Sequence, residues 1–347
     1  MALRRLHIFL LVAFALVPLW AECDDVRGYY PQGVEGLSGE KLLNSLRIVI
    51  RNHENYMSQF DENQLWCMFR KTDVRGDGTV WDMFSPNLVS FPLEGVPAGM
   101  GYCHIAVPEW IDDGLPYDEA MSLDLHNLFP CSEEVAVLKN DLIPWRIEDV
   151  IFDNGVFCVG YGQLSGSNIM AYELSNEYKG DIARVLMYIA ACYGGEFKWY
   201  GQSWGLFNEN SYPVFTNSVK STIIAWHEQD PVDEKEEKRN AKIYELQGNR
   251  NPFVDYPELA SHIWGDMIDE PFYFSGSGDG GEVLKSNYSL DDKVWLCSQY
   301  VPDDATWIID GKPVAASYIM ANELGVGIHE LRFTTASVKG KIIIEVR

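Results

Sequence analysis

The chain has 347 residues, of which 47% are apolar, and its 27 Lys and Arg residues stand against 51 Asp and Glu residues, a net charge of −24. This length and composition predict a globular protein with one large domain or two unequal ones, and exclude a disordered chain. Because phosphate contacts come mainly from Lys and Arg, the acidic balance counts against broad, non-specific nucleic-acid binding without excluding a local basic cleft.

Residues 1–21 have the pattern of an export signal. A basic start is followed by an apolar stretch over residues 8–20, which is too short to span a bilayer, and by Ala21 as the small residue of a cleavage site. Removal of this segment leaves 25 basic and 51 acidic residues, a net charge of −26. Glu22 directly before Cys23 argues against a lipoprotein anchor. We therefore predict export to the periplasm, the cell surface or the medium.

Seven cysteines follow the predicted cleavage site, and an exported compartment permits disulfides. Their number is odd, and they form no CxxC pair or regular spacing, which argues against a zinc cluster. The sequence does not assign their pairing.

The first elements of the main domain follow in chain order. Leu42 and Leu46 have helical spacing behind Ser38, a predicted N-cap, so a helix is expected there. Residues 65–85 combine apolar positions with the turn sequence GDG. This pattern predicts the end of a helix and then a strand that starts at Thr79.

Three more helices are predicted in the second half of this domain. Residues 179–194 place apolar side chains on one face, with Asp181 in the first turn, where the helix dipole favours an anion. A second helix is expected over residues 217–229. The third begins at Asp233, in an Asp-capped relative of the capping box, and ends at Gly248.

The composition changes near the C-terminal end of the main domain. Residues 272–290 are rich in Gly and Ser and predict a linker followed by a strand. The runs TWIIDGKPV, GIHELRF and GKIIIEV, separated by Asp-Gly and Gly turns, suit a small antiparallel sandwich of immunoglobulin type. We therefore expect an α+β chain with a main domain over residues 22–270, followed by a linker and an Ig-like β-sandwich over residues 271–347.

Several blocks of the main domain point to one nuclease family. They are DLHNLFP (124–130), KGDIARVLMYIAACYG (179–194) and QGNRNPF (247–253). Over roughly residues 28–260 the chain resembles the endonuclease I family, secreted bacterial nucleases of the ββα-metal, or His-Me finger, type. The resemblance implies that two strands and a helix hold one divalent ion, Mg²⁺ or Ca²⁺, at the scissile phosphate of DNA or RNA while a histidine activates water.

The family's ion-binding positions are altered here. Its first-strand motif has Glu before His, and the matching CHIAVPEW has His104 in the general-base position, Cys103 in place of the Glu, and the family's Trp at Trp110. The helix ligand, an Asn in the family, falls at Ala136. A thiol is a poorer ligand for Mg²⁺ than a carboxylate, and alanine offers no lone pair. Lys139 replaces an Arg and keeps a charge for a substrate phosphate, but loses the bidentate fork.

Other residues of the predicted helix offer a substitute oxygen ligand. If residues 132–141 form a helix capped by Ser132, then Glu133 and Asn140 share a face with Ala136. The simpler interpretation makes both ordinary surface residues.

The central motif is expected to support the site. Asp124 and His126 would alternate onto one side of a strand, and the resemblance implies that they and Asn127 act through hydrogen bonds and not as ion ligands. Three arginines lie in the family-like blocks, and the sequence leaves open whether they contact phosphate or brace the fold: Arg184, Arg239 and Arg250.

The sequence is compatible with two functions. One is an exported, metal-dependent endonuclease that cleaves DNA or RNA with His104 as general base and a rearranged ion site. The other is a catalytically degenerate relative, a pseudoenzyme without a required metal, whose scaffold has a binding or structural role at the cell envelope. The changes at Cys103 and Ala136 and the acidic charge motivate the second function.

Overall fold

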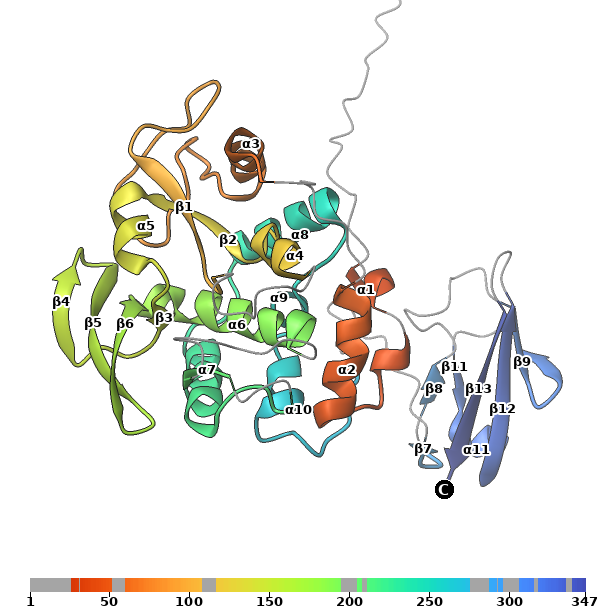
Figure 1. The fold of residues 1–347 in the computed structure, drawn as a ribbon. Coiled ribbons are helices and arrows are strands. Elements are labelled where there is room, and N and C mark those ends of the chain that lie inside the picture. The colour runs from red at the N-terminus through yellow and green to blue at the C-terminus, as the bar shows by residue number, and fades with distance from the viewer. Residues whose placement is uncertain are drawn as a thin grey trace, which may run out of the picture.

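The computed structural model describes most of the main domain and parts of the C-terminal region (Figure 1). The described residues are 26–30, 32–51, 60–107, 117–194, 205–207, 211–274, 287–291, 293–295, 306–314, 318–334 and 339–347. The predicted export signal, Cys23 and Trp110 lie outside them. Among the described helices, none has the length and apolar content needed to cross a membrane.

The main domain has a mixed α and β fold. Its α-helices are α1 (Val26–Tyr29), α2 (Gly39–Ile50), α3 (Glu62–Thr72), α4 (Tyr117–Ser122), α5 (Glu133–Lys139), α6 (Lys179–Tyr193), α7 (Asn217–Gln229), α8 (Glu234–Gln247), α9 (Pro252–Asp255) and α10 (Leu259–Trp264). The 3₁₀ helices among the described residues are η1 (Gln32–Val34) and η3 (Asn176–Tyr178). The strands are β1 (Met100–His104), β2 (Leu128–Ser132), β3 (Ile143–Pro144), β4 (Asp149–Asp153), β5 (Phe157–Leu164) and β6 (Ser167–Leu174).

Helix α6 lies at the centre of this domain, with α2 and α7 packed against it (Figure 1). The sequence predicts one buried face, but every residue of α6 from Gly180 to Tyr193 is buried. Small residues such as Ala183 and Ala190 let neighbouring elements approach on the side that a surface helix would leave to solvent.

The predicted helices are confirmed. Ser38 precedes α2, and α7 has the expected bounds. Asp233 caps α8, with its side chain accepting from the Glu236 N–H, and the reciprocal bond completes a capping box. Gly248 ends α8 in the left-handed conformation, with φ 82°.

Two strand predictions are wrong, both where short polar side chains bond to the nearby backbone. Thr79 forms only an isolated bridge with Ser90, because the Asp77 carboxylate accepts from the Thr79 N–H and hydroxyl in a tight turn. Asp124 and His126 also lie in a turn: Asp124 Oδ1 accepts from the His126 N–H at 2.9 Å.

Two sheets organise the middle of the domain. Strands β1 and β2 form an antiparallel pair, and β2 leads directly into α5. A four-stranded sheet has the order β3-β6-β5-β4. Figure 1 shows α5 next to this sheet, with β1 and β2 beside α5. Side chains of all three elements, such as Cys103, Phe129 and Val135, belong to the main core of the domain.

The C-terminal region contains β7 (Asn287–Tyr288), β8 (Lys293–Trp295), β9 (Thr306–Ile309), β10 (Lys312–Val314), β11 (Tyr318–Met320), α11 (Ala321–Leu324), β12 (Gly327–Thr334) and β13 (Lys339–Val346). One sheet has the order β10-β9-β12-β13-β7, and β11 pairs with β8. The predicted strands and their Asp-Gly turn are therefore present. An immunoglobulin-type topology stays a prediction, because the parallel β13–β7 pair is not part of a simple antiparallel sandwich.

Candidate functional site

Strands β1 and β2 and helix α5 meet where the sequence predicts a site. His104 lies opposite Leu128 at one end of the ladder. The Ser132 hydroxyl accepts from the Val135 N–H at 3.2 Å and starts α5 immediately after β2. The helix lies close over β1: a Cβ placed on Gly101 would be 3.9 Å from the Ala136 Cβ. The two altered positions, Cys103 of β1 and Ala136 of α5, therefore belong to the region where this strand and this helix are in contact.

His104 is half-buried at the end of β1, and its ring is held by backbone. Nε2 lies 2.8 Å from the Ser122 carbonyl oxygen at the end of α4. Because a carbonyl only accepts, Nε2 must carry a proton, and the neutral ring then has its lone pair on Nδ1. This tautomer and orientation suit a general base.

The two positions that bind the ion in the family provide no oxygen here. Cys103 is buried, and Ala136 is half-buried against the core. Glu133 is exposed, and Asn140 is exposed with its amide donating to the Asp141 carboxylate at 3.0 Å. Within the described part of the chain, no three His, Cys, Asp or Glu side chains gather as ligands of one metal ion. Thiol and methyl groups do not fit the hard divalent ion that the family fold implies.

The Lys139 side chain points into the protein. It is fully buried, its Nζ donates to the His104 carbonyl oxygen at 2.5 Å, and it lies 4.9 Å from the centre of the Tyr172 ring. The ammonium therefore holds the end of β1 against α5 and the four-stranded sheet. This position does not suit the predicted contact with a substrate phosphate.

Asp124 is a fully buried hub beneath the site. Its Oδ2 accepts from the hydroxyls of Tyr188 and Tyr193 on α6, at 2.6 and 2.7 Å. Its Oδ1 accepts from the Gln247 amide on α8 at 2.7 Å. One carboxylate thus ties the turn before β2 to two helices.

Asn127 and His126 of the same motif bond to and pack on neighbouring elements. The Asn127 amide donates to the Ala106 carbonyl and its oxygen accepts from the Ala106 N–H, both at 2.8 Å. The His126 ring packs on Tyr188, with 4.6 Å between ring centres. Asn127 thus makes hydrogen bonds and His126 a ring contact, and their role in supporting the site stays a prediction.

The three arginines of the family-like blocks are buried and bonded to acids. Arg184 binds Glu236 through two nitrogens, one at 2.6 Å and one at 2.5 Å. Arg239 donates to Asp73 at 2.9 Å and to two backbone carbonyls, and Arg250 donates to Asp255 at 2.8 Å. These guanidinium groups are therefore part of the interior and do not form a phosphate-binding surface. The sequence could not show this, because most of these partners are distant along the chain.

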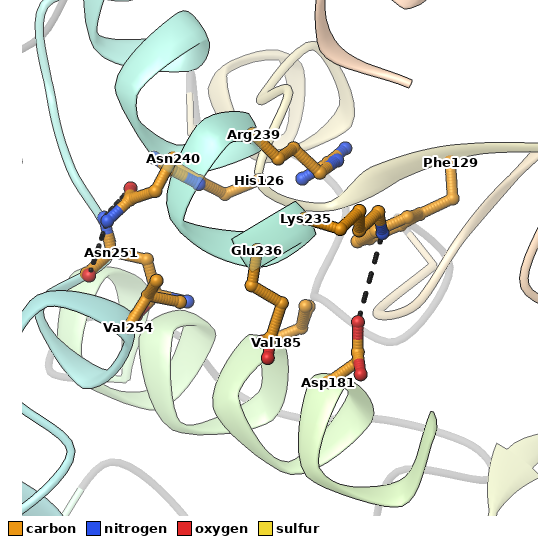
Figure 2. A pocket seen from close by; sticks show the side chains of 10 residues that line it. All are labelled: His126, Phe129, Asp181, Val185, Lys235, Glu236, Arg239, Asn240, Asn251 and Val254. Atoms are coloured by element: carbon orange, nitrogen blue, oxygen red, sulfur yellow. Dashed lines mark hydrogen bonds and ion pairs between the residues drawn. The ribbon is translucent and has the colours of Figure 1, made fainter. Parts of the chain in front are cut away.

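A small cavity lies between α6 and α8 (Figure 2). Its volume is about 30 Å³, and Lys235 lies 3.8 Å from Asp181 at its wall. His126 and the bonded pair Asn240 and Asn251 also line it. A cavity of this size suits one or two water molecules and is too small for a nucleotide.

A wider open hollow of about 460 Å³ lies where α7, α8 and α9 approach each other. Its lining includes four acidic residues: Glu228, Glu237, Asp255 and Glu258. A negative lining repels a phosphate backbone, so this hollow does not suit nucleic acid.

Asp82 and Cys131 of β2 have raised pKa values. Burial raises the pKa of Asp82 to about 7, against hydrogen bonds from the backbone of Phe84 and Ser132. A hydrogen bond with Cys103 and burial raise the pKa of the Cys131 thiol, and the charge of Lys139 acts in the opposite direction.

Comparison with known proteins identifies the scaffold. The endonuclease I family model matches residues 38–258. The extracellular ribonuclease of Bacillus subtilis (strain 168) is 29% identical over 246 residues, which cover 69% of this chain and 79% of that protein. The extracellular ribonuclease of Bacillus amyloliquefaciens is 28% identical over 251 residues, with the same two shares. The extracellular deoxyribonuclease of Aeromonas hydrophila is 30% identical over 139 residues, 39% of this chain and 50% of that protein. The family expected from the sequence is thus confirmed: the chain belongs to the endonuclease I family.

Proposed function

We propose that this protein is an exported endonuclease I relative that has lost ion-dependent cleavage of phosphodiester bonds and serves a binding role outside the cytoplasm. The observation that carries the proposal is the contact between β1 and α5. A hard divalent ion needs several oxygen ligands at about 2.0–2.6 Å. The contact offers the Cys103 thiol and the Ala136 methyl group, with the Lys139 ammonium beside them.

The distribution of charge supports the same conclusion. The net charge is −24, and the arginines of the family-like blocks bind internal carboxylates. A nuclease needs basic groups at its surface to hold the substrate backbone. The Ig-like C-terminal region would then be the second binding module of an exported protein, as such small sandwiches often are.

A second candidate is an active metal-dependent endonuclease for DNA or RNA. The specific observation in its favour is the His104 ring, which the Ser122 carbonyl holds in the tautomer of a base. The extracellular nucleases among the relatives also favour it. This candidate requires an oxygen ligand from outside the family positions, for example Glu133, to hold Mg²⁺ or Ca²⁺.

A restoration experiment separates the two candidates. The purified mature chain and Cys103→Glu/Ala136→Asn are incubated with plasmid DNA and with RNA in Mg²⁺, Ca²⁺ or Mn²⁺. We expect no cleavage by the parent and nicking by the double variant. Adding His104→Ala to the double variant should abolish that nicking, which controls for a contaminating nuclease. Cleavage by the parent that EDTA stops and His104→Ala abolishes would establish the second candidate.

A further inference from the structure

His329 is a polar residue on the core-facing side of β12. It lies directly opposite Ile344 of β13 and alternates with Leu331, and both of these apolar side chains are fully buried. Residues that face each other across an antiparallel pair share a face of the sheet, as do alternate residues of one strand. The His329 ring therefore lies on the same face as the apolar core of the C-terminal region, and the residue is only 8% exposed.

Both ring nitrogens of His329 have an oxygen atom as partner. Nδ1 lies 2.7 Å from Oδ2 of Asp310, which is in the turn between β9 and β10. Nε2 lies 2.8 Å from the carbonyl oxygen of Gly325, directly after α11. A carbonyl and an ionised carboxylate only accept hydrogen bonds, so each ring nitrogen must carry a proton. The geometry thus fits the positively charged imidazolium and not the neutral ring.

The pKa of His329 agrees with this geometry. Burial of the ring lowers it, but the hydrogen bonds with Asp310 and with the Gly325 carbonyl, together with the charge of Asp310, raise it above the ordinary value of 6.5. The same hydrogen bond holds the pKa of Asp310 below its ordinary value.

The other charged groups on the neighbouring elements have partners of their own. Arg332 of β12 pairs with Glu330, and Arg347 pairs with Glu345 of β13. Glu323 of α11 accepts from the backbone of the residue before that helix, and Lys312 of β10 acts on Asp310. Asp310 is therefore the charged group that decides the protonation of the ring.

The segment before His329 depends on glycine for its conformation. Gly325 has φ 84° and Gly327 has φ 146°, values that residues with a side chain rarely adopt. Val326 and Ile328, which alternate with these glycines, are 72% and 75% exposed. Because glycine backbone is free to adopt other conformations, the bonds of His329 help to fix the path of this segment.

We propose that His329, Asp310 and the Gly325 carbonyl form a pH-sensitive clamp, which fixes residues 325–328 when the ring is charged and releases them when the ring is neutral. Loss of one proton to the solvent leaves one ring nitrogen with a lone pair. This lone pair then faces either a carboxylate or a carbonyl oxygen, so one of the two hydrogen bonds is replaced by repulsion.

The direction of the switch follows from the raised pKa. The folded state keeps the proton more tightly than the unfolded state does, so the clamp stabilises the C-terminal region fully below about pH 6.5. This stabilisation is lost as pH rises through the pKa of the folded state. The segment is therefore fixed in a mildly acidic medium and released in an alkaline one.

The first test is an NMR titration of the full mature chain with ¹⁵N-labelled histidine. We expect the His329 ring to titrate above pH 6.5, with both nitrogens protonated at the acidic end. Asp310→Asn should lower this pKa, because it removes the negative charge. Glu345→Gln, which removes a carboxylate of the adjacent β13, is the matched control and should leave the pKa near that of the parent. His329→Gln assigns the signal.

The second test is hydrogen exchange of residues 325–330 after correction for the intrinsic effect of pH on exchange. Between pH 6 and a pH above the measured pKa, opening of this segment should increase by about tenfold for each pH unit by which that pKa exceeds 6.5. In His329→Gln this increase should be absent.

Three outcomes would overturn the inference. One is a His329 ring that titrates at or below pH 6.5 in the parent. Another is a pKa that Asp310→Asn leaves unchanged, and the third is equal pH dependence of exchange in the parent and in His329→Gln. Circular dichroism melting checks that the variants fold. Asp310→Glu, which keeps a carboxylate, should retain a higher pKa at His329 than Asp310→Asn does.

Discussion

Asp124 lies in a short turn, but its carboxylate accepts hydrogen bonds from two helices of the main domain. Its two oxygens accept from Tyr188, Tyr193 and Gln247, which belong to α6 and α8. The sequence motif predicts that this residue supports the site, but not how, because these partners are 64–123 residues away. With the His126 N–H, four donors share this one carboxylate and form a network in which loss of the acceptor affects every member.

We predict that Asp124→Ala lowers the free energy of unfolding by about 3–5 kcal/mol, because it removes the acceptor of four buried donors. Urea denaturation followed by tryptophan fluorescence measures this change. Glu234→Ala is the control, since its exposed ion pair with Lys238 should contribute at most about 0.5 kcal/mol. A loss at Asp124 as small as the control's would show that the network does not hold the helices together.

A second prediction concerns Asp82 and pH. Its pKa is about 7 in the folded state against 3.8 ordinarily, so between these values the folded state keeps a proton that the unfolded state loses. The contribution of Asp82 to the free energy of unfolding therefore falls by about 1.4 kcal/mol for each pH unit as pH rises from about 4 to about 7. Above about pH 7 this contribution is constant. Asp82→Asn should remove this slope, so the variant should gain stability relative to the parent between pH 4.5 and pH 8. Parallel curves for the two proteins in urea denaturation would contradict the assigned pKa.

At the scale of elements, the local signals of the sequence predict the helices well. Capping residues, apolar spacing and the terminating Gly248 act within one or two turns, and the structure has α2, α6, α7 and α8 where these signals place them. The failures at Thr79 and Asp124 share one cause. An Asp side chain bonds to the backbone two residues on, and this bond competes with strand pairing in a way that apolar alternation does not reveal.

The candidate site was predicted only in part. Family spacing predicts that His104, Cys103 and Ala136 belong to one site. The structure brings α5 close over β1 at Gly101 and Ala136, whereas the His104 ring lies at the Ser122 carbonyl. The inward position of Lys139 and the roles of the arginines depend on partners far along the chain, such as Asp73 for Arg239, 166 residues apart. A single sequence does not show which residues so far apart in the chain come into contact.

The end of α8 allows a prediction at this scale. Gly248 has φ 82°, and no atom lies within 4 Å of the position that a Cβ would take. Its substitution therefore tests backbone strain without a clash. Gly248→Ala should lower stability by about 1 kcal/mol, and Gly248→Asn should lower it less, because Asn tolerates the left-handed region better. Thermal melting of the three proteins gives the order, and equal losses for Ala and Asn would refute the strain explanation.

At the scale of the whole molecule, the negative net charge determines how binding to a nucleic acid depends on salt. Mutual repulsion with DNA is strongest at low salt. The distance over which charges act on each other, the Debye length, is about 30 Å at 0.01 M salt and only about 8 Å at 0.15 M. Nucleic-acid-binding proteins show the opposite trend, because salt weakens their phosphate contacts. The net charge of −24 therefore predicts that any residual binding of a labelled oligonucleotide does not weaken as salt rises.

Fluorescence anisotropy from 20 to 200 mM salt, values of the order at which such contacts respond, tests this prediction. A basic nuclease measured alongside serves as the control. Tight binding at low salt that disappears at high salt would reveal a local basic cleft and would favour the active-nuclease candidate.

The complete burial of α6 has a consequence for how the domain opens. Helices at the surface can fray alone, whereas the amide hydrogens of α6 are covered by other elements on every side. Their exchange with deuterium should require opening of the whole domain, while the exposed face of α5 should exchange through local opening. The exchange rate of α6 amides would then report the global free energy of unfolding in native buffer, and α5, next to His104, would be the part of the candidate site that opens first.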